Sequence, residues 1–566
     1  MTRQGDLERA PGRAMLAQAR RRPDPGRWDE DTRASSADGS APARSPRSVP
    51  RTVLLGSVLL VAALAHGLNL LGFPYYENDE GVYAGQAWAV LRLGQLAPYA
   101  YTYDHPPLGW LLLAAWAGLT AGLHTFGTAI DSGRVLMLVL QLGSTALVYG
   151  IGRRLSGRRA IGAVAGLLFA LSAVGIYYHR RVLLDNVATF WLVLAISLLV
   201  GQDARARPSR AGLVGSALAF GAAILTKEVT AAFLPALLAF AAWRADGWRW
   251  RPAVGWLALA LAVAALYPLH AYRQGELAPA WMPTLGTHSG ISLLGTLAEQ
   301  MGRGRDGGLL QPGSQFWSMG GRWVREEPLL VAGGTLAAMA LVCSIRRRPA
   351  EGAIGLAVLL FWLFLGRGGQ TLPFYILPIL PLLALSVALV AGALAERVGG
   401  ARRGVGPERP GLPAGLALLA VPLLLLLPGY TAPTLGLGDD PLALWRNHQA
   451  DAQRQAMAWF RDNAEPTSRI VVDDALWPDL RDGPRGGPDF PNAHPYWKLE
   501  RDPAVRDAAF AADWRRIDYV GVSPQMRADV ASANLTLLSA ALENSRPVAS
   551  FDAGGWPLEI RRVGGR

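Results

Sequence analysis

The sequence contains very little lysine, a single cysteine and few charged residues for its length. Of the 566 residues, 17% are charged, against about 25% in a typical soluble protein. Cys343 is the only cysteine, which excludes an internal disulfide and a metal site built from several cysteines. Lys227 and Lys498 are the only lysines, so arginine supplies nearly all of the basic charge. The net charge of +12 therefore calls for a membrane explanation first, and we expect no nucleic-acid partner.

Two further absences narrow the function. The sequence has no visible internal repeat, and it has neither a GxGxxG loop nor a GxxxxGK[ST] loop. These glycine-rich loops bind phosphates in dinucleotide-binding enzymes and in nucleotide-driven pumps. Their absence argues against a transporter that is powered by a nucleotide.

Long apolar runs fill the chain between Arg51 and Tyr430. Many approach the roughly 20 residues that span a bilayer, and they predict a polytopic α-helical membrane protein. The twelve candidate segments are 52–73, 107–123, 133–152, 160–177, 187–201, 211–226, 229–243, 253–272, 329–345, 352–366, 374–395 and 412–430. Residues 1–50 lack apolar periodicity and the apolar core of a signal peptide, so we expect a disordered cytoplasmic tail.

The positions of the arginines predict how these segments are oriented in the membrane. Five short connections are rich in arginine, and the positive-inside rule places them in the cytoplasm. They contain Arg153, Arg154, Arg158 and Arg159; Arg205, Arg207 and Arg210; Arg244, Arg249 and Arg251; Arg346 to Arg348; and Arg397, Arg402, Arg403 and Arg409. If successive segments cross the membrane in alternating directions, all five connections reach the cytoplasm only when one early segment does not cross. The short segment 107–123 follows His105-Pro106, so we expect a juxtamembrane or re-entrant helix there, and eleven crossings in all.

After Tyr430 the composition becomes typical of a soluble protein. An amphipathic stretch covers 450–463, short β-rich runs occupy 470–472 and 518–522, and a strand pair is expected around 548–563. This alternation of helix and strand patterns predicts a small α/β domain. The expected organisation is a tail (1–50), a membrane domain (51–430) and an extracytoplasmic domain (431–566).

Ionisable residues gather at the outer ends of the apolar segments. A charge near hydrocarbon is expensive, so such a residue suggests a functional site. Four clusters have this placement: Asn78-Asp79-Glu80-Gly81-Val82-Tyr83, Tyr103-Asp104-His105-Pro106-Pro107, His179-Arg180-Arg181-Val182-Leu183-Leu184-Asp185-Asn186 and Thr226-Lys227-Glu228. A carboxylate can act as a general base for a hydroxyl, while arginine and lysine hold a phosphate and stabilise its negative charge. The clusters therefore suggest transfer of a group from a lipid phosphate to a hydroxyl.

The same residues resemble a known family, the GT-C glycosyltransferases that use polyprenyl-phosphate sugars, which include protein O-mannosyltransferases and aminoarabinose transferases. The resemblance covers roughly residues 52–395. It rests on Asp79-Glu80-Gly81-x-Tyr83, Asp104-His105-Pro106-Pro107-Leu108, Gly152-Arg153-Arg154-Leu155-Ser156-Gly157-Arg158-Arg159, Arg181-x-x-x-Asp185, Thr226-Lys227-Glu228 and Thr371-x-Pro373-x-Tyr375-x-Leu377-Pro378. It implies about 11–13 transmembrane helices, with juxtamembrane helices on the outer face.

The resemblance also implies roles for individual residues. Asp79 would be the catalytic base, and Glu80 would support it or contact the acceptor. The phosphate of the donor would be bound by His105, by Arg180 or Arg181, and by Lys227. Residues that orient these groups or bind the acceptor would be Tyr83, Asp104, Asp185, Glu228 and Tyr375. The sequence departs from the aminoarabinose transferases at Asp104-His105, where they resemble Glu-Lys, and a histidine is only partly charged near pH 7.

Simpler interpretations stay open at several positions. Asp79 and Glu80 would also suit the first turn of a helix, arginines can extend to headgroups, and Lys227 and Glu228 can form an ion pair. Trp459, Trp477 and Trp497 can stack on sugars or anchor a small core, and Asp473-Asp474 can bind a ligand or form a solvated turn. No cofactor is expected to be required, although a divalent cation would find oxygen and nitrogen ligands in Asp79, Asp104 and His288.

The expected function is transfer of one sugar from a polyprenyl monophosphate to a protein, lipid or glycan acceptor, with inversion at the anomeric carbon. The abundance of arginine, alanine and glycine suggests a GC-rich bacterial genome and a plasma membrane, with the site on the extracytoplasmic face among membrane lipids. The alternatives are a transporter or flippase for a lipid-linked or anionic solute, and a sensor. A transporter would place its ionisable groups near the midplane, and a sensor would leave the charged clusters unexplained.

Overall fold

The computed structural model describes residues 51–201, 208–244, 250–279, 291–401, 429–430, 435, 440–483 and 487–564. The tail predicted at 1–50, His288 and most of the segment predicted at 412–430 lie outside these ranges.

The described chain up to residue 401 is helical. Its α-helices are α1 (Arg51–Gly67), α2 (Asn78–Leu93), α3 (Leu108–Leu119), α4 (Ala129–Ser156), α5 (Arg159–Ala170), α6 (Ala173–His179), α7 (Leu184–Val200), α8 (Arg210–Thr226), α9 (Leu234–Arg244), α10 (Trp250–Ala264), α11 (Leu266–Arg273), α12 (Leu293–Gly302), α13 (Gln315–Glu326), α14 (Gly334–Cys343), α15 (Pro349–Leu365) and α16 (Leu380–Ala401). Short 3-10 or π turns include η1 (Glu228–Phe233), η3 (Leu329–Gly333) and η4 (Pro373–Ile379). Every predicted apolar segment except 412–430 coincides with one or two of these helices.

Several of the described helices suit a bilayer by length and composition. Three are long and apolar enough to cross it, namely Ala129–Ser156, Trp250–Arg273 and Pro373–Arg397. Two bent pairs would make five spans, Arg159–Ala170 with Ala173–His179 (bent by 61°) and Gln315–Glu326 with Leu329–Cys343 (bent by 112°). Shorter apolar helices add to these, among them Leu184–Val200 and Arg210–Thr226. The chain is a multi-pass membrane protein, and the number of eleven crossings stays a prediction.

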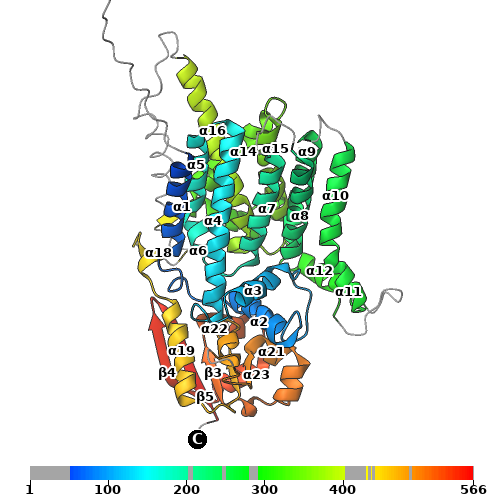
Figure 1. Ribbon diagram of the computed structural model, residues 1–566. Helices are drawn as coiled ribbons and strands as arrows, with labels where there is room; N and C mark the ends of the chain where they lie inside the picture. The colour runs from blue at the N-terminus through cyan, green and yellow to red at the C-terminus, as the bar shows by residue number, and fades with distance from the viewer. Residues whose placement is uncertain are drawn as a thin grey trace, which may run out of the picture. The chain divides into compact units, whose positions relative to one another are not determined.

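Helices α2 and α3 lie at one end of the helical bundle (Figure 1). With 12 residues at about 1.5 Å per residue, α3 is roughly 18 Å long, well short of the ~30 Å hydrocarbon core. This length agrees with the expectation that the segment near 107–123 does not cross. Both helices follow α1 and precede α4, and they bring the two predicted acidic motifs to the same end.

The described residues after 440 form a five-stranded sheet with helices. The strands are β1 (Ile470–Val472), β2 (Ala493–Pro495), β3 (Tyr519–Val522), β4 (Ser545–Ala553) and β5 (Trp556–Val563), and the helices are α18 (Ala443–Arg446), α19 (Ala450–Asn463), α20 (Trp477–Arg481), α21 (Tyr496–Arg501), α22 (Pro524–Ser532) and α23 (Thr536–Glu543). The strand order is β2-β1-β3-β5-β4. Strand β1 pairs in parallel with β2 and β3, whereas β5 is antiparallel to both β3 and β4.

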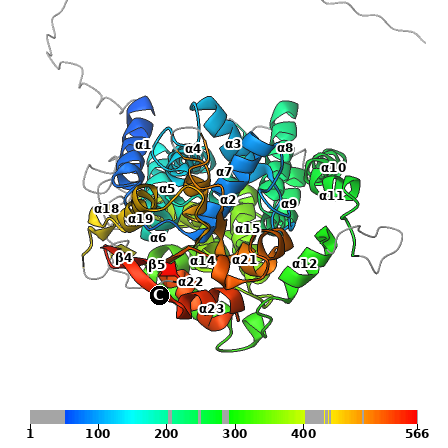
Figure 2. The same cartoon turned by 90° about the horizontal axis from the view of Figure 1, so that it is seen from below.

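The side chains of β1 alternate between the two faces of the sheet, so they belong to two separate apolar clusters. Ile470 and Val472 pack with Phe460 of α19, whereas Val471 packs with Leu499 of α21 and Leu538 of α23. Successive strand residues point to opposite faces, so the apolar run Ile470-Val471-Val472 is buried on both sides. Figure 2 shows α21 and α23 at the end of the molecule nearest the viewer.

Two helices of the C-terminal residues, α19 and α20, contact α2 and the residues that enter it. Trp88 of α2 meets Trp477 of α20 edge to face, with ring centres 5.5 Å apart. Gln453 of α19 accepts a hydrogen bond from the backbone N–H of Tyr76 (2.6 Å) and donates one to its carbonyl (2.7 Å). The chain that enters α2 is therefore held from both sides, by the helical bundle and by the C-terminal residues.

Candidate active site

The first turn of α2 presents three carboxylates with different surroundings. Glu77 is the N-cap residue, and it forms a capping box with Glu80. The Glu80 side chain is fully buried and accepts hydrogen bonds from the backbone N–H groups of Glu77 (3.1 Å) and Val182 (2.9 Å). Arg134 of α4 binds both oxygens of Glu80, at 2.9 and 2.8 Å. Glu80 is thus a fully paired anchor of α2, a placement that favours support of Asp79 over contact with an acceptor.

Asp79 lies next to Glu80 but faces a cluster of cations. Its side chain is half-buried. Burial raises the pKa of Asp79 above its usual value, and the Asp185 carboxylate adds to this increase, while the charges of Lys227, His105 and Arg181 oppose it. A raised pKa makes a carboxylate a better proton acceptor. Burial raises the pKa of Glu77 as well, but Glu77 and Glu80 each form a direct ion pair with an arginine. Asp79 differs from them in lying near several cations that other carboxylates hold.

Lys227 lies at the end of α8, where the apolar helix stops. Its Nζ is 2.5 Å from Oδ2 of Asp185 on α7, and both side chains are nearly inaccessible to solvent. The Lys227 ammonium also lies 5.3 Å from the centre of the Tyr375 ring, close enough for a cation–π contact. Asp185 therefore holds the lysine, and Tyr375 covers one side of it.

His105 precedes α3 and pairs with Glu228, the residue that follows Lys227. Nδ1 of His105 lies 3.2 Å from both carboxylate oxygens of Glu228. Burial lowers the pKa of His105, but the Glu228 carboxylate outweighs this effect, and the pKa lies above its usual value. The imidazole is therefore more cationic than an isolated histidine. Its ring centre is 6.5 Å from that of Tyr83, which is buried on α2.

Arg181 is the third cation of the cluster. It forms a salt bridge with Glu77, and its guanidinium lies over the rings of Tyr75 and Tyr177, at 4.6 and 4.8 Å. The neighbouring Arg180 points elsewhere. Its guanidinium donates to the carbonyls of Ala65 (3.0 Å), Leu68 (2.8 Å) and Leu444, so Arg180 joins backbone segments and does not reach Asp79. Of the two arginines, the geometry favours Arg181 for binding a phosphate.

Asp104, which was expected to orient His105 or to bind the acceptor, makes its side-chain hydrogen bond elsewhere in the described structure. It is exposed, and its carboxylate accepts a hydrogen bond from the hydroxyl of Thr102 at 2.5 Å. Glu228 takes the position beside His105 instead. The structure thus brings together the predicted residues Asp79, Tyr83, His105, Arg181, Asp185, Lys227, Glu228 and Tyr375 and leaves Glu80, Asp104 and Arg180 outside the cluster.

Sequence reasoning missed several supporting residues. Glu77, the partner of Arg181, precedes Glu80 by three residues, and this spacing is the signal of a capping box. Arg134 gave no signal, because it lies 54 residues from Glu80. Asn78 donates to the hydroxyl of Tyr496, which in turn donates to Asp529. C-terminal residues therefore contact the α2 motif one position before Asp79.

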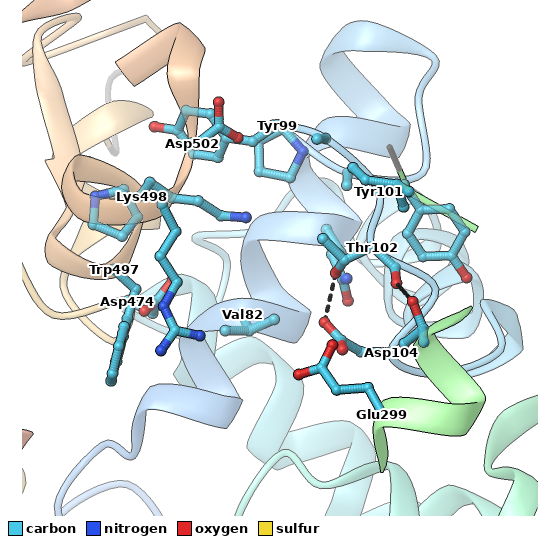
Figure 3. A pocket seen from close by; sticks show the side chains of 18 of the residues that line it. Val82, Tyr99, Tyr101, Thr102, Asp104, Glu299, Asp474, Trp497, Lys498 and Asp502 are labelled. Carbon is cyan, nitrogen blue, oxygen red and sulfur yellow. Dashed lines mark hydrogen bonds between the residues drawn. The ribbon is translucent and has the colours of Figure 1, made fainter. Parts of the chain in front are cut away.

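A cavity of about 970 Å³ opens beside the motif. Gly81 and Val82 of α2 are among the residues that line it. Tyr101, Thr102 and Asp104 lie on one side with Glu299 of α12, and Asp474, Trp497 and Lys498 lie across from them (Figure 3). Of the three tryptophans considered from the sequence, Trp477 and Trp497 line the cavity, whereas Trp459 packs against Phe460 and Tyr519. The cavity offers aromatic faces and both signs of charge within a short distance of Asp79.

The described residues contain no group of three His, Cys, Asp or Glu side chains arranged to hold a metal ion. Asp79 and Asp104 were considered for a divalent cation together with His288, which lies outside the described ranges. The carboxylate of Asp104 accepts a hydrogen bond from the hydroxyl of Thr102.

Comparison with known sequences identifies relatives. The family described as dolichyl-phosphate-mannose-protein mannosyltransferase matches residues 104–272. A polyprenol-phosphate-mannose–protein mannosyltransferase of Mycobacterium tuberculosis is 35% identical over 159 residues, which are 27% of this chain and 29% of that protein. An undecaprenyl phosphate-alpha-4-amino-4-deoxy-L-arabinose arabinosyl transferase of Pseudomonas fluorescens is 28% identical over 361 residues, 61% of this chain and 60% of that protein. The chain thus spans less than a third of the length of the mannosyltransferase.

Comparison with solved structures adds the fold. The crystal structure of ArnT from Cupriavidus metallidurans bound to undecaprenyl phosphate superposes with a TM-score of 0.57, over 91% of this chain and 98% of that one, at 16% identity. At this identity the match establishes a shared fold alone. Together, the comparisons confirm the resemblance to GT-C glycosyltransferases that the sequence motifs predicted.

Proposed function

We propose that this protein is an inverting glycosyltransferase that moves one sugar from a polyprenyl monophosphate carrier to an acceptor hydroxyl. One observation carries the proposal. Three cations, His105, Arg181 and Lys227, surround Asp79, and each is held by its own carboxylate (Glu228, Glu77 and Asp185). A base beside several fixed cations is what transfer from a lipid phosphate to a hydroxyl requires.

The mechanism follows from this arrangement. Asp79 accepts the proton of the acceptor hydroxyl as its oxygen attacks the anomeric carbon on the face opposite the phosphate. The bond between that carbon and the phosphate oxygen breaks, and the electron pair leaves with the lipid monophosphate. Lys227, Arg181 and His105 stabilise the charge that grows on the leaving phosphate, and because carboxylates already fix them, little reorganisation is needed. The configuration at the anomeric carbon is inverted.

The named relatives support a polyprenyl-phosphate donor. The mannosyltransferase family matches residues 104–272. This range contains His105, Arg181 and Lys227, which we assign to the donor phosphate, and Asp185 and Glu228, which hold two of these cations. The relatives are named for two different sugars, mannose and 4-amino-4-deoxy-L-arabinose. Both sugars therefore belong in a donor panel, and the acceptor is a protein, lipid or glycan hydroxyl.

We place this chemistry on the extracytoplasmic side of a bacterial plasma membrane. The arginine-rich connections at Arg153–Arg159 and Arg346–Arg348 lie at the end of the bundle opposite α2, α3 and the sheet (Figure 1). By the positive-inside rule that end faces the cytoplasm. Asp79 and the C-terminal residues then face outward, where an exported acceptor is available.

The test is sugar transfer by the purified full chain in nanodiscs. Polyprenyl-phosphate mannose and polyprenyl-phosphate aminoarabinose are supplied separately with native membrane extract as acceptor, and release of lipid monophosphate is measured. Asp79→Asn should reduce turnover by about 10²–10⁴-fold, the usual contribution of a general base, while carrier lipid still binds. Asp462→Asn is the matched control, because Asp462 is exposed on α19, and it should keep wild-type turnover.

Two results would overturn the proposal. An Asp79→Asn variant that retains most of its turnover would remove Asp79 as the base. A wild-type chain that binds carrier lipid but consumes neither donor would favour movement of the lipid across the membrane, which proteoliposomes would then test.

A further inference from the structure

A second cavity, of about 600 Å³, lies at the end of the bundle far from Asp79. It is formed where α4 and α9 end, where α5 and α15 begin, and where residues Leu389 to Glu396 of α16 pass beside them, at the end opposite the sheet (Figure 1). The positive-inside rule predicts that this end faces the cytoplasm. The cavity therefore belongs to a different surface from the site proposed for transfer.

The polar lining of this cavity is basic. It contains the four arginines Arg158, Arg244, Arg347 and Arg348 and the two carboxylates Glu351 and Glu396, which leaves a net charge of +2. The carboxylates are shared: Glu396 pairs with Arg158 at 3.1 Å and lies 4.0 Å from Arg348, which also pairs with Glu351 at 3.3 Å. The two carboxylates therefore cannot neutralise all four arginines of the lining.

Two of the arginines differ in how they are held. Arg244 is buried, and its guanidinium caps α7 by donating to the carbonyls of Leu199 (3.0 Å) and Val200 (2.9 Å). Arg347 is exposed, and its side chain makes no hydrogen bond or ion pair within the described part of the chain. Arg347 is therefore the cation of this cavity that is best placed to meet an added anion.

The start of α15 adds to the positive potential. Pro349, Ala350 and Glu351 form the first turn of this 17-residue helix, and all three line the cavity. The first N–H groups of a helix lack partners within the helix, and they favour an anion. The start of α15 and the arginines thus both favour an anion in this cavity.

The rest of the lining is apolar. Leu155, Ile161, Trp243 and Leu389 contribute to the wall, the first three near the ends of α4, α5 and α9 and Leu389 within α16. Basic pockets between helices on the cytoplasmic side of a membrane suit anionic lipid headgroups. An amphipathic ligand would satisfy both parts of this lining, whereas a free anion would use only one.

We propose that this cavity binds the phosphate of an anionic membrane lipid on the cytoplasmic face, with Arg347 and Arg348 as its principal contacts. The phosphate lies between these arginines and the start of α15, and the first part of the lipid tail lies against Trp243 and Leu389. Binding here does not depend on the transfer reaction at Asp79. The lipid is a phospholipid such as phosphatidylglycerol or a polyprenyl phosphate, since both carry the same group.

Native mass spectrometry of the purified full chain in detergent tests the proposal. Phosphatidylglycerol, phosphatidylcholine with the same acyl chains, undecaprenyl phosphate and inorganic phosphate are titrated separately. Arg347→Gln should weaken binding of an anionic lipid about fivefold, the effect of one basic residue near a charged surface. Arg346→Gln is the matched control, because it removes the same charge from the same connection but does not line the cavity.

A second variant separates binding from structure. Glu396→Gln removes a carboxylate that occupies Arg158 and Arg348, so it should strengthen lipid binding, whereas a merely structural role would predict a loss. The lipid whose binding responds to Arg347→Gln is the ligand. The proposal is overturned if Arg347→Gln and Arg346→Gln have equal effects on both anionic lipids, if phosphatidylcholine binds as tightly as they do, or if inorganic phosphate does.

Discussion

Gly81 on α2 lies directly against the main chain of Asp474, which follows strand β1. A Cβ atom added to Gly81 would lie 2.0 Å from the carbonyl oxygen of Asp474 and 2.4 Å from the backbone nitrogen of Ala475. Real Cβ atoms do not approach backbone atoms so closely, so only glycine permits this contact. Two residues after Asp79, the helix that carries the proposed base is therefore seated on the C-terminal part of the chain.

Gly81→Ala should separate these two surfaces and displace Asp79. A displacement of about 1 Å at a catalytic group can reduce turnover by about 10²-fold, so we expect a 10- to 100-fold loss of transfer. Overpacking of this kind also costs about 1–3 kcal/mol of stability. Transfer assays and thermal unfolding measure the two effects. Gly118→Ala on α3 is the control, because its added Cβ would meet no atom within 4 Å, and it should change neither.

The buried pair of Lys227 and Asp185 predicts a non-additive pair of variants. Removal of one partner leaves a buried charge uncompensated, at a cost of about 3–5 kcal/mol, so Lys227→Met and Asp185→Asn should each lower the unfolding temperature. The double variant should recover much of this loss. It should not recover binding of undecaprenyl phosphate, since the cation is still missing. Recovery of lipid binding in the double variant would show that Lys227 does not contact the phosphate.

The pairing of His105 with Glu228 predicts an alkaline limit to donor binding. Because the pKa of His105 is raised, the imidazolium is present below that pKa and is lost as pH rises through it. The KM for the donor should then increase at high pH. Glu228→Gln removes the charge that raises the pKa, and it should move this increase to lower pH, while His105→Gln should abolish it. An unchanged pH profile in both variants would argue against a role for His105 in donor binding.

The raised pKa of Asp473 predicts that the stability of the C-terminal sheet depends on pH. Burial raises its pKa to about 7, and the nearby Asp474 carboxylate adds to this, although the Ser523 hydroxyl opposes it. The folded chain therefore holds a proton that the unfolded chain releases near pH 4. Stability should fall as pH rises from about 4 to 7, and Asp473→Asn should reduce this fall by an amount on the order of 2 kcal/mol.

Hydrogen exchange of β1 and β3, corrected for the intrinsic rate at each pH, measures this dependence in the full-length protein. Asp462→Asn again serves as the control, since its exposed carboxylate should leave the profile of the wild type unchanged. Equal slopes for Asp473→Asn and the wild type would show that another group titrates.

Local patterns predicted those parts of the fold that depend on local periodicity. The amphipathic stretch at 450–463 became α19 with the same bounds, and Ile470-Val471-Val472 became β1. Strand β2 was not predicted, because Ala493-His494-Pro495 is short, contains a proline and lies at the edge of the sheet. Edge strands of this kind carry little apolar alternation.

The charged clusters that gather at the candidate site were predicted from the sequence, but the pairs that their residues form were not. The four charged clusters do converge, because the connections and helix ends that carry them lie at the same end of the helical bundle (Figure 1). Which charge meets which depends on tertiary packing: His105 pairs with Glu228 rather than with its neighbour Asp104, and Arg180 and Arg181, adjacent in sequence, face different surroundings. No local pattern contains this information.

The contact between Gly81 and Asp474 also has a consequence for how the protein is made. A ribosome releases the α2 motif long before strand β1, and chains generally fold from the N-terminus first. The newly inserted membrane helices must therefore wait for the residues around strand β1 before Asp79 acquires its final surroundings. A nascent or truncated chain that ends before residue 470 would lack the backbone against which Gly81 packs, so the turn that carries Asp79 would lose this support.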